Sequence, residues 1–211
     1  RELLQLPAEE QFTPEQIIQA ILKLPVDMLF NGGIGTYIRA DDERDQEVGD
    51  PANSACRIPA SAVNSKMIVE GGNLGVTPKG RIQISSQGTL INTDFVDNSG
   101  GVDCSDHEVN LKTLLSQEVR SGRLGFEERN QVLEEVQGDV CDMVLANHRE
   151  QGLLLGLDEI RSQSDPFSFE RTISVLEDRD ILNRAEQFLP TPEELTKRHT
   201  EGQSLTRSEL A

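Results

Sequence analysis

The apolar positions near the start of the chain have helical spacing and then change to short continuous runs. Thr13, Pro14 and Gln16 together form a helix start signal, because each suits its place in the first turn. Apolar residues at positions 17, 18, 21 and 22 form one stripe before Pro25. We therefore predict an amphipathic helix that begins at Pro14 and that Pro25 ends.

Short β-prone runs follow this helix and are separated by turns that contain glycine. The predicted strands cover residues 26–30, 66–69, 81–84, 88–91 and 95–96. Between the first two of them, residues 40–66 are polar and mixed, and we expect a partly helical excursion on the surface there. A helix followed by a short buried strand and a glycine turn is typical of a parallel αβ unit.

The pattern becomes wholly helical after the last of these runs. Ser105 and Glu108 have the spacing of a capping box, and leucines at helical spacing follow them. Further helices are predicted over residues 132–144 and 173–188, and Thr191 starts another. The expected fold class is therefore α/β, with a parallel sheet followed by an all-helical segment.

The charge of the chain argues against two classes of partner. Its 211 residues include 37 Asp and Glu but only 20 Lys and Arg, which gives a net charge of −17. A surface this negative repels phosphodiester backbones and anionic lipid headgroups, so we expect no nucleic acid and no membrane partner. Cys56, Cys104 and Cys141 are distant and odd in number, which is typical of a cytoplasmic protein with reduced thiols.

Three turns that combine asparagine with glycine follow predicted strands, at residues 31–33, 71–73 and 98–101. The carboxyl ends of parallel strands share one edge of a sheet, and ligands of open α/β sheets bind there. Glycine lets the backbone approach a flat ligand, and asparagine offers both a donor and an acceptor. The turns are also explained as ordinary turns, since both residue types favour them. Taken together, the three favour a shared nucleotide crevice, although no G-x-G-x-x-G phosphate loop accompanies them.

These segments resemble a known enzyme family. Residues 70–77 are similar to the Glu-Gly-Ala-Asn-x-Pro-Thr stretch of glutamate dehydrogenases, and residues 98–108 to their Asn-Ala-Gly-Gly-Val-x-x-Ser-x-x-Glu stretch. Residues 29–37 are similar to a sequence of the large bacterial NAD-specific glutamate dehydrogenases. The likeness is highly specific from Leu24 to Lys112 and looser beyond it.

The resemblance implies a site for the cofactor NAD and a pocket for the substrate glutamate. The implied cofactor-binding residues are Gly32, Gly33, Asn73, Asn98, Gly100 and Gly101. Asn73 matches the family's asparagine beside the nicotinamide ribose, and Asn98 matches the one near the nicotinamide carboxamide. Val102 and Ser105 match residues that line the substrate pocket, where the serine hydroxyl receives the side-chain carboxylate of glutamate.

The same resemblance implies oxidative deamination of L-glutamate to 2-oxoglutarate and ammonia, with hydride transfer to NAD. It implies a partial Rossmann-like sheet, the second half of a dinucleotide-binding domain, over residues 1–106 and a helical continuation over 107–211. The family's catalytic lysine and aspartate are expected upstream of Arg1, since both ends of the chain look cut. We therefore expect no catalytic residue here and an inactive chain on its own. The full-length protein is expected to be a cytoplasmic homo-oligomer.

Three alternatives stay open at the level of sequence. Ser105 is fully explained by helix capping with Glu108, although a helix N-terminus also attracts a carboxylate. Cys104 and His107 have the spacing of metal ligands but no second pair nearby, so no metal site is expected. A non-catalytic nucleotide-binding or oligomerisation module would keep the crevice without the chemistry.

Overall fold

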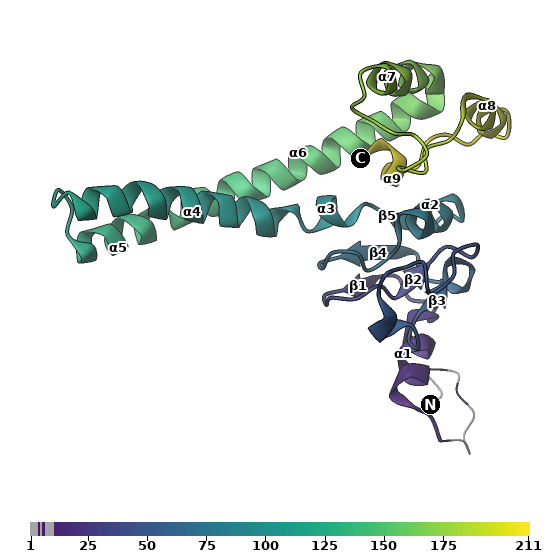
Figure 1. Cartoon of the computed structure of the whole chain (residues 1–211), viewed down its shortest axis with the longest axis horizontal. Helices are drawn as coiled ribbons and strands as arrows, with labels where there is room; N and C mark the ends of the chain where they lie inside the picture. The colour runs from purple at the N-terminus through teal and green to yellow at the C-terminus, as the bar shows by residue number, and fades with distance from the viewer. Residues whose placement is uncertain (1–3, 5, 7–10) are drawn as a thin grey trace. The chain divides into compact units, whose positions relative to one another are not determined.

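The computed structural model describes residue 4, residue 6 and residues 11–211, and these form two compact units. The first unit combines the chain up to Asp97 with Leu155–Ala211, and the second is Asn98–Leu154 (Figure 1). The predicted domain boundary between residues 106 and 107 lies inside a helix of the second unit. It stays a prediction about the domains of the whole enzyme.

The first unit contains the predicted parallel sheet. Its three strands, in the order β1-β4-β5, are β1 (Leu29–Asn31), β4 (Met67–Glu70) and β5 (Leu90–Ile91). Phe30 pairs with Val69 and Ile68 pairs with Ile91, all in parallel register, so the three carboxyl ends share one edge. The mixed α/β class with a parallel sheet is therefore confirmed. Each strand begins one to three residues later than its predicted run, and β1 and β5 are also shorter than predicted.

The segment between β1 and β4 is built more deeply into this unit than the sequence predicts. It contains β2 (Ile38–Arg39), η1 (Pro51–Asn53), β3 (Ile58–Pro59) and η2 (Ala60–Ala62), with β2 and β3 paired in parallel. The buried core cluster consists of Ile38, Ile58, Ala60, Ile68, Val76, Ile84 and Ile91. The prediction of a surface excursion is therefore wrong for the part of this segment around β3.

The part around β3 was predicted to lie on the surface because its sequence contains a charged residue, Arg57, which is in fact buried. The side chain of Arg57 is fully buried, and its Nε donates to the carbonyl oxygen of Thr36 at 2.9 Å. Its Nη1 lies 3.1 Å from Oδ1 of Asp45. A charged residue can lie in a core when its donors are satisfied in this way, and composition alone does not reveal the partners.

Two of the predicted helix starts are confirmed. In α1 (Pro14–Leu22), Thr13 and Gln16 form the expected capping box, and the helix ends three residues before Pro25. In α8 (Pro192–Thr200), Thr191 forms a capping box with Glu194.

Two of the predicted strands are helices instead. α2 (Pro78–Ser86) replaces the strand expected at 81–84, because Thr77 accepts a hydrogen bond from the Gly80 N–H at 3.0 Å and Pro78 occupies the first turn. α3 (Asp94–Asp97) replaces the strand expected at 95–96. The third glycine segment therefore follows a helix and not a strand, and its residues 99–101 are themselves helical.

The second unit is formed by α4 (Ser99–Arg120), α5 (Phe126–Glu135) and the first part of α6 (Gln137–Ser164). Helix α6 returns along α4 (Figure 1). Asn98 is the N-cap of α4, seven residues before the predicted N-cap at Ser105. The capping-box prediction for Ser105 is therefore wrong, because that residue lies well inside the helix, with its backbone already in the hydrogen-bonded ladder.

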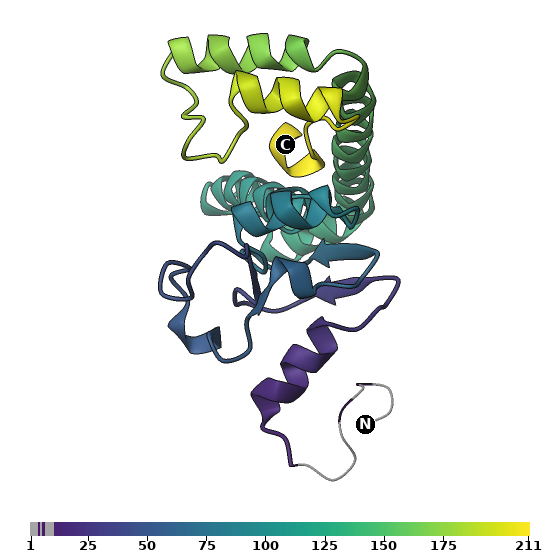
Figure 2. The same ribbon diagram turned by 90° about the vertical axis from the view of Figure 1, so that its right-hand side faces the viewer.

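The C-terminal helices of the first unit are α7 (Pro166–Asp178), α8 and α9 (Arg207–Leu210). Figure 2 shows α7 and α8 side by side, and the rings of Phe167 and His199 meet edge to face at 5.8 Å. Arg207 joins α9 to the sheet, since its Nε donates to Oδ1 of Asn92 at 2.7 Å. No helix among the described residues is long and apolar enough to cross a membrane.

The helix predicted up to residue 188 ends instead at Asp178, and an irregular segment follows. Arg184 holds this segment against α7: its guanidinium lies 2.8 Å from Oε1 of Glu170 and 2.9 Å from Oε2 of Glu177. It also donates to the carbonyl oxygen of Pro190 at 2.7 Å. One side chain therefore joins two carboxylates of α7 to a backbone carbonyl of the segment that follows it.

Replacing Arg184 by Met is expected to destabilise this segment by about 2 kcal/mol at neutral pH, because charge-assisted hydrogen bonds are lost. The hydrogen bond from Arg184 lowers the pKa of Glu170 from its ordinary value of 4.5. The stabilisation is therefore present above pH 4.5 and is lost as the pH falls through the lower pKa of the folded protein. The Leu189 amide donates to the carbonyl oxygen of Arg184 at 3.0 Å, so its hydrogen exchange, measured at neutral and acid pH, tests this. A difference between wild type and variant that does not shrink in acid would contradict it.

Candidate functional site

Two of the three glycine turns lie in contact at the carboxyl ends of β1 and β4. The N–H groups of Gly71 and Gly72 both donate to the carbonyl oxygen of Asn31, at 2.8 and 3.2 Å. A Cβ added to Gly72 would lie 2.6 Å from the carbonyl oxygen of Gly33. The shared edge predicted from the sequence is therefore present for these two turns, and glycine at position 72 is what lets them approach.

Gly33 differs from Gly72 in what surrounds it. A Cβ added to Gly33 would meet no heavy atom of the described chain within 4 Å. Close packing inside the protein therefore does not explain a glycine at this position. The exposed side of the turn is open to a ligand that lies flat against the backbone.

A buried ion pair supports the second glycine turn, residues 71–73. The side chain of Glu70, the last residue of β4, is fully buried; its Oε2 lies 2.6 Å from Nε of Arg81, and its Oε1 lies 3.0 Å from Nη2. The same Oε1 accepts the N–H of Val76 at 3.0 Å. The Glu70 carboxylate thus ties helix α2 to the far end of the turn.

The pKa values of this pair show two opposed effects. Burial raises the pKa of Glu70, while the hydrogen bonds and charge of Arg81 act in the opposite direction. Burial also lowers the pKa of Arg81, but Glu70 and Asp94 outweigh it, so the pKa of the guanidinium is raised. Arg81 therefore stays charged, and both carboxylate oxygens of Glu70 have donors.

Two aspartates from α3 complete the support. Oδ2 of Asp94 accepts the N–H of Leu74 at 2.7 Å and lies 3.2 Å from Nη2 of Arg81. Oδ2 of Asp97 accepts the N–H of Glu70 at 2.9 Å. Leu74 has a positive φ of 61°, a conformation that needs such support in a residue other than glycine. The turn that carries the exposed Asn73 is thus fixed by its backbone on both sides.

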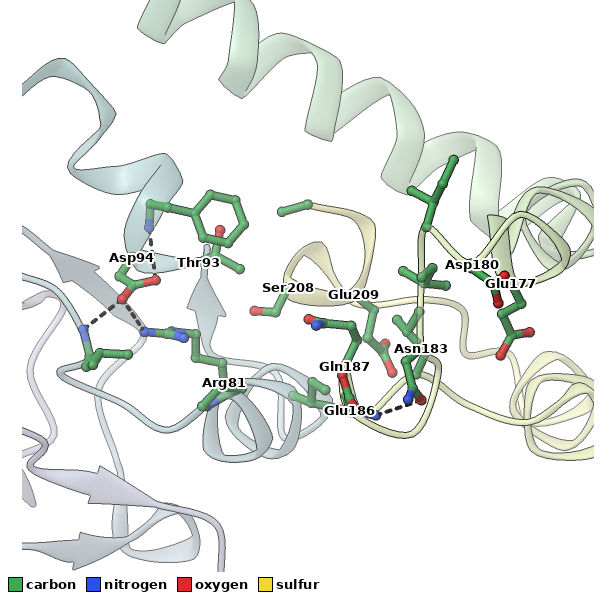
Figure 3. A pocket seen from close by; sticks show the side chains of 18 residues that line it. Arg81, Thr93, Asp94, Glu177, Asp180, Asn183, Glu186, Gln187, Ser208 and Glu209 are labelled. Carbon is green, nitrogen blue, oxygen red and sulfur yellow. Dashed lines mark hydrogen bonds and ion pairs between the residues drawn. The ribbon is translucent and has the colours of Figure 1, made fainter. Parts of the chain in front are cut away.

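A cavity of about 860 Å³ is lined by Arg81 and Asp94 together with residues of the C-terminal part of the first unit. Figure 3 shows these two residues on one side of it and Asn183, Glu186 and Gln187 on the other. The lining includes five carboxylates, those of Asp94, Glu177, Asp180, Glu186 and Glu209. Because so acidic a lining repels a pyrophosphate, we do not assign a dinucleotide to this cavity.

The remaining predicted site residues lie on α4, in the second unit. At roughly 100° per residue, Asn98, Gly101, Val102 and Ser105 project within about 100° of one another, on one face of the helix. Val102 is 65% exposed, and Gly101 and Ser105 are also exposed. Gly100 lies off this face, since a Cβ added there would be 3.5 Å from Cγ1 of Val144.

The predicted residues thus form two groups, one in each compact unit. The first unit holds Gly32, Gly33 and Asn73, and the second holds Asn98, Gly100, Gly101, Val102 and Ser105. The contact between the turns brings the first group together, and the helix brings the second group together. Whether the two groups bind the same molecules stays a prediction.

Sequence reasoning missed Arg81 and Asp94. Arg81 lies in the strand predicted over 81–84, and Asp94 lies directly before the one predicted over 95–96. The helices that place these side chains next to the glycine turn were therefore not predicted. The only signal was Thr77-Pro78, a helix start directly after the turn. Among the described residues, no group of three His, Cys, Asp or Glu side chains could hold a metal ion.

Replacing Arg81 by Met is expected to raise the rate of hydrogen exchange at the Leu74 and Val76 amides. Removing one partner leaves the Glu70 charge buried, and broken buried pairs typically lose about 3–5 kcal/mol. The matched control is Arg44→Met, because Arg44 and Glu47 form an ion pair whose side chains are largely exposed. Equal exchange at these amides in both variants would show that the buried pair does not hold the turn.

Comparison with known proteins gives consistent matches. The family model described as the catalytic domain of bacterial NAD-glutamate dehydrogenase matches residues 1–158. The NAD-specific glutamate dehydrogenases of Halomonas elongata, Pseudomonas aeruginosa and Mycobacterium tuberculosis are 42%, 43% and 45% identical to the chain. These alignments cover 95–96% of the chain but only 12–13% of each relative. The chain therefore spans about an eighth of the length of these curated relatives, and it belongs to the family of the bacterial NAD-glutamate dehydrogenase catalytic domain.

Proposed function

We propose that the chain forms the nicotinamide-facing wall and one side of the glutamate pocket of an NAD-dependent glutamate dehydrogenase. The observation that carries this proposal is the contact between turns 31–33 and 71–73 at the carboxyl ends of adjacent parallel strands. Ligands of open α/β sheets bind outside such ends. The names of the relatives supply the cofactor and the substrate.

The cofactor side of the proposal rests on open backbone at glycine and on the amide side chains of two asparagines. Gly33 leaves room for a flat ring, and the exposed side chain of Asn73 can both donate to and accept from a ribose hydroxyl. Asn98, the half-buried N-cap of α4, has the same amide chemistry for the nicotinamide carboxamide, and the exposed Gly101 leaves room beside it. When bound, NAD would accept a hydride from the α-carbon of glutamate. On this proposal the sheet is part of a Rossmann-like fold.

The substrate side rests on the next turn of the same helical face. Ser105 presents a hydroxyl that can donate to the side-chain carboxylate of glutamate, and Val102 presents an apolar wall one turn earlier. These residues bind and orient the substrate. We assign proton transfer to a lysine and an aspartate outside this chain, in a cytoplasmic homo-oligomer of the full-length protein.

Glycine-to-alanine variants of the full-length protein test the cofactor side. Gly101→Ala adds a methyl group in open space within a helix, so it is expected to stabilise α4 by about 0.5–1 kcal/mol and yet raise the KM for NAD at least threefold. Gly152→Ala in α6 is the matched control, because its added Cβ also meets nothing within 4 Å. It is expected to leave the KM for NAD unchanged. If both variants keep the KM for NAD, the open face of α4 does not meet the cofactor.

Ser105→Ala tests the substrate side. Loss of a hydrogen bond to a charged group typically weakens binding by about 1.5–3 kcal/mol, which corresponds to a KM for glutamate about 10-fold to 150-fold higher. The KM for NAD is expected to change less than twofold. Steady-state kinetics of glutamate oxidation measure both constants. Equal changes in both would favour a structural role for Ser105, and no NAD-dependent oxidation of glutamate by the wild type would favour the non-catalytic module.

A further inference from the structure

The first two turns of α4 have a second face, opposite the exposed one. Ser99, Gly100, Asp103 and His107 project within about 100° of one another, and the centre of this arc lies roughly opposite the arc that contains Ser105. Asp103 and His107 are half-buried, whereas Gly101, Val102 and Ser105 on the other face are exposed. The start of α4 therefore has one exposed face and one half-buried face.

Helix α6 contacts this second face at three points, all within the second unit. Nδ1 of His148 lies 3.0 Å from the hydroxyl oxygen of Ser99. Nδ2 of Asn147 donates to Oδ2 of Asp103 at 2.8 Å. Gly100 faces Val144, since a Cβ added there would lie 3.5 Å from Cγ1 of Val144, an ordinary van der Waals distance. The contact to Ser99 is the one nearest the beginning of α4.

The beginning of α4 needs such support because of its own sequence. Gly100 and Gly101 are its second and third residues, and each glycine weakens a helix by roughly 0.5–1 kcal/mol relative to alanine. Helix ends fray first, and a pair of glycines makes fraying easier. The hydrogen bond between His148 and Ser99 holds the residue that lies between Asn98 and this glycine pair.

We propose that His148 is a positioning residue that fixes the cofactor-binding beginning of α4 through Ser99. This inference rests on the proposed function for its kinetic consequence, although the contact itself does not. Ser105 lies six residues after Ser99, about 9 Å along the helix, inside the hydrogen-bonded ladder. Loss of the His148 contact therefore loosens Asn98 and the glycine pair but leaves Ser105 in place.

Substitutions of His148 in the full-length protein test the proposal by steady-state kinetics. His148→Ala is expected to raise the KM for NAD about threefold to tenfold, the effect of losing one ordinary hydrogen bond, and to change the KM for glutamate less than twofold. Arg149→Ala, at the adjacent exposed position of α6, is the control and is expected to match the wild type. Wild-type kinetics in His148→Ala, or equal changes in both KM values, would overturn the proposal.

The choice of nitrogen gives a sharper test. Asn places its amide close to the position of Nδ1, whereas Gln places it close to that of Nε2. His148→Asn is therefore expected to restore the KM for NAD to within twofold of wild type, and His148→Gln to behave like His148→Ala. Rescue by Gln but not by Asn would contradict the use of Nδ1.

Hydrogen exchange separates this inference from the proposed function. The Gly101 amide donates to the carbonyl oxygen of Asn98 at 3.0 Å, so it reports fraying directly. Exchange at this amide is expected to be about threefold to tenfold faster in His148→Ala and unchanged in His148→Asn. An inactive wild type with this exchange pattern would refute the enzyme but support the positioning contact. An active wild type with no change in exchange would refute the contact alone.

Discussion

The buried ion pair of Glu70 and Arg81 is the interaction on which the candidate site depends. It occupies the point where strand β4 ends, where the glycine turn begins and where helix α2 returns against the sheet. A buried pair stabilises a structure only when its remaining hydrogen-bonding positions are filled. Here Val76 fills one position on Glu70, and Asp94 takes up a further donor of Arg81. The same bonds that satisfy the charges therefore set the path of the turn.

In this arrangement the backbone of the turn is held in place, while the groups that can bind a ligand stay exposed. The backbone of the turn is held at Glu70 before Asn73 and at Leu74 and Val76 after it, while Asn73 and Gly33 remain on the exposed side. Helix α4 repeats the division in another form, with α6 holding one face and leaving the other exposed. Binding groups that are held in place before a ligand arrives lose less entropy when it binds. Both parts of the candidate site are built on this principle.

The sequence allowed the parallel sheet, the capping boxes at Thr13 and Thr191 and the contact between two glycine turns to be predicted. These features rest on local signals, namely short apolar runs, capping residues and glycine. The prediction was wrong at α2 and α3, where short apolar pairs in helices have the spacing of a strand. It also misplaced the start of α4, because Ser105 and Glu108 imitate a cap inside a helix that begins at Asn98.

The residues that could not be predicted are those whose roles depend on distant partners. Arg57 and Arg81 look like surface residues in the sequence, yet each is buried against a carboxylate of another segment, Asp45 at 12 residues' separation and Glu70 at 11. His148 is 49 residues from Ser99, and nothing in its local pattern indicates a contact. Local periodicity carries no information about which charges will meet, so such pairs emerge only from the fold.

The central proposal is that Asn73, in the turn after β4, and Asn98, at the start of α4, both bind the nicotinamide end of NAD. A structure of the full-length protein bound to NAD tests it most directly, through the distances from these two side-chain amides to the nicotinamide ribose and carboxamide. We expect both amides within hydrogen-bonding distance, about 2.7–3.2 Å, of those groups. A dinucleotide bound away from either asparagine would contradict the account.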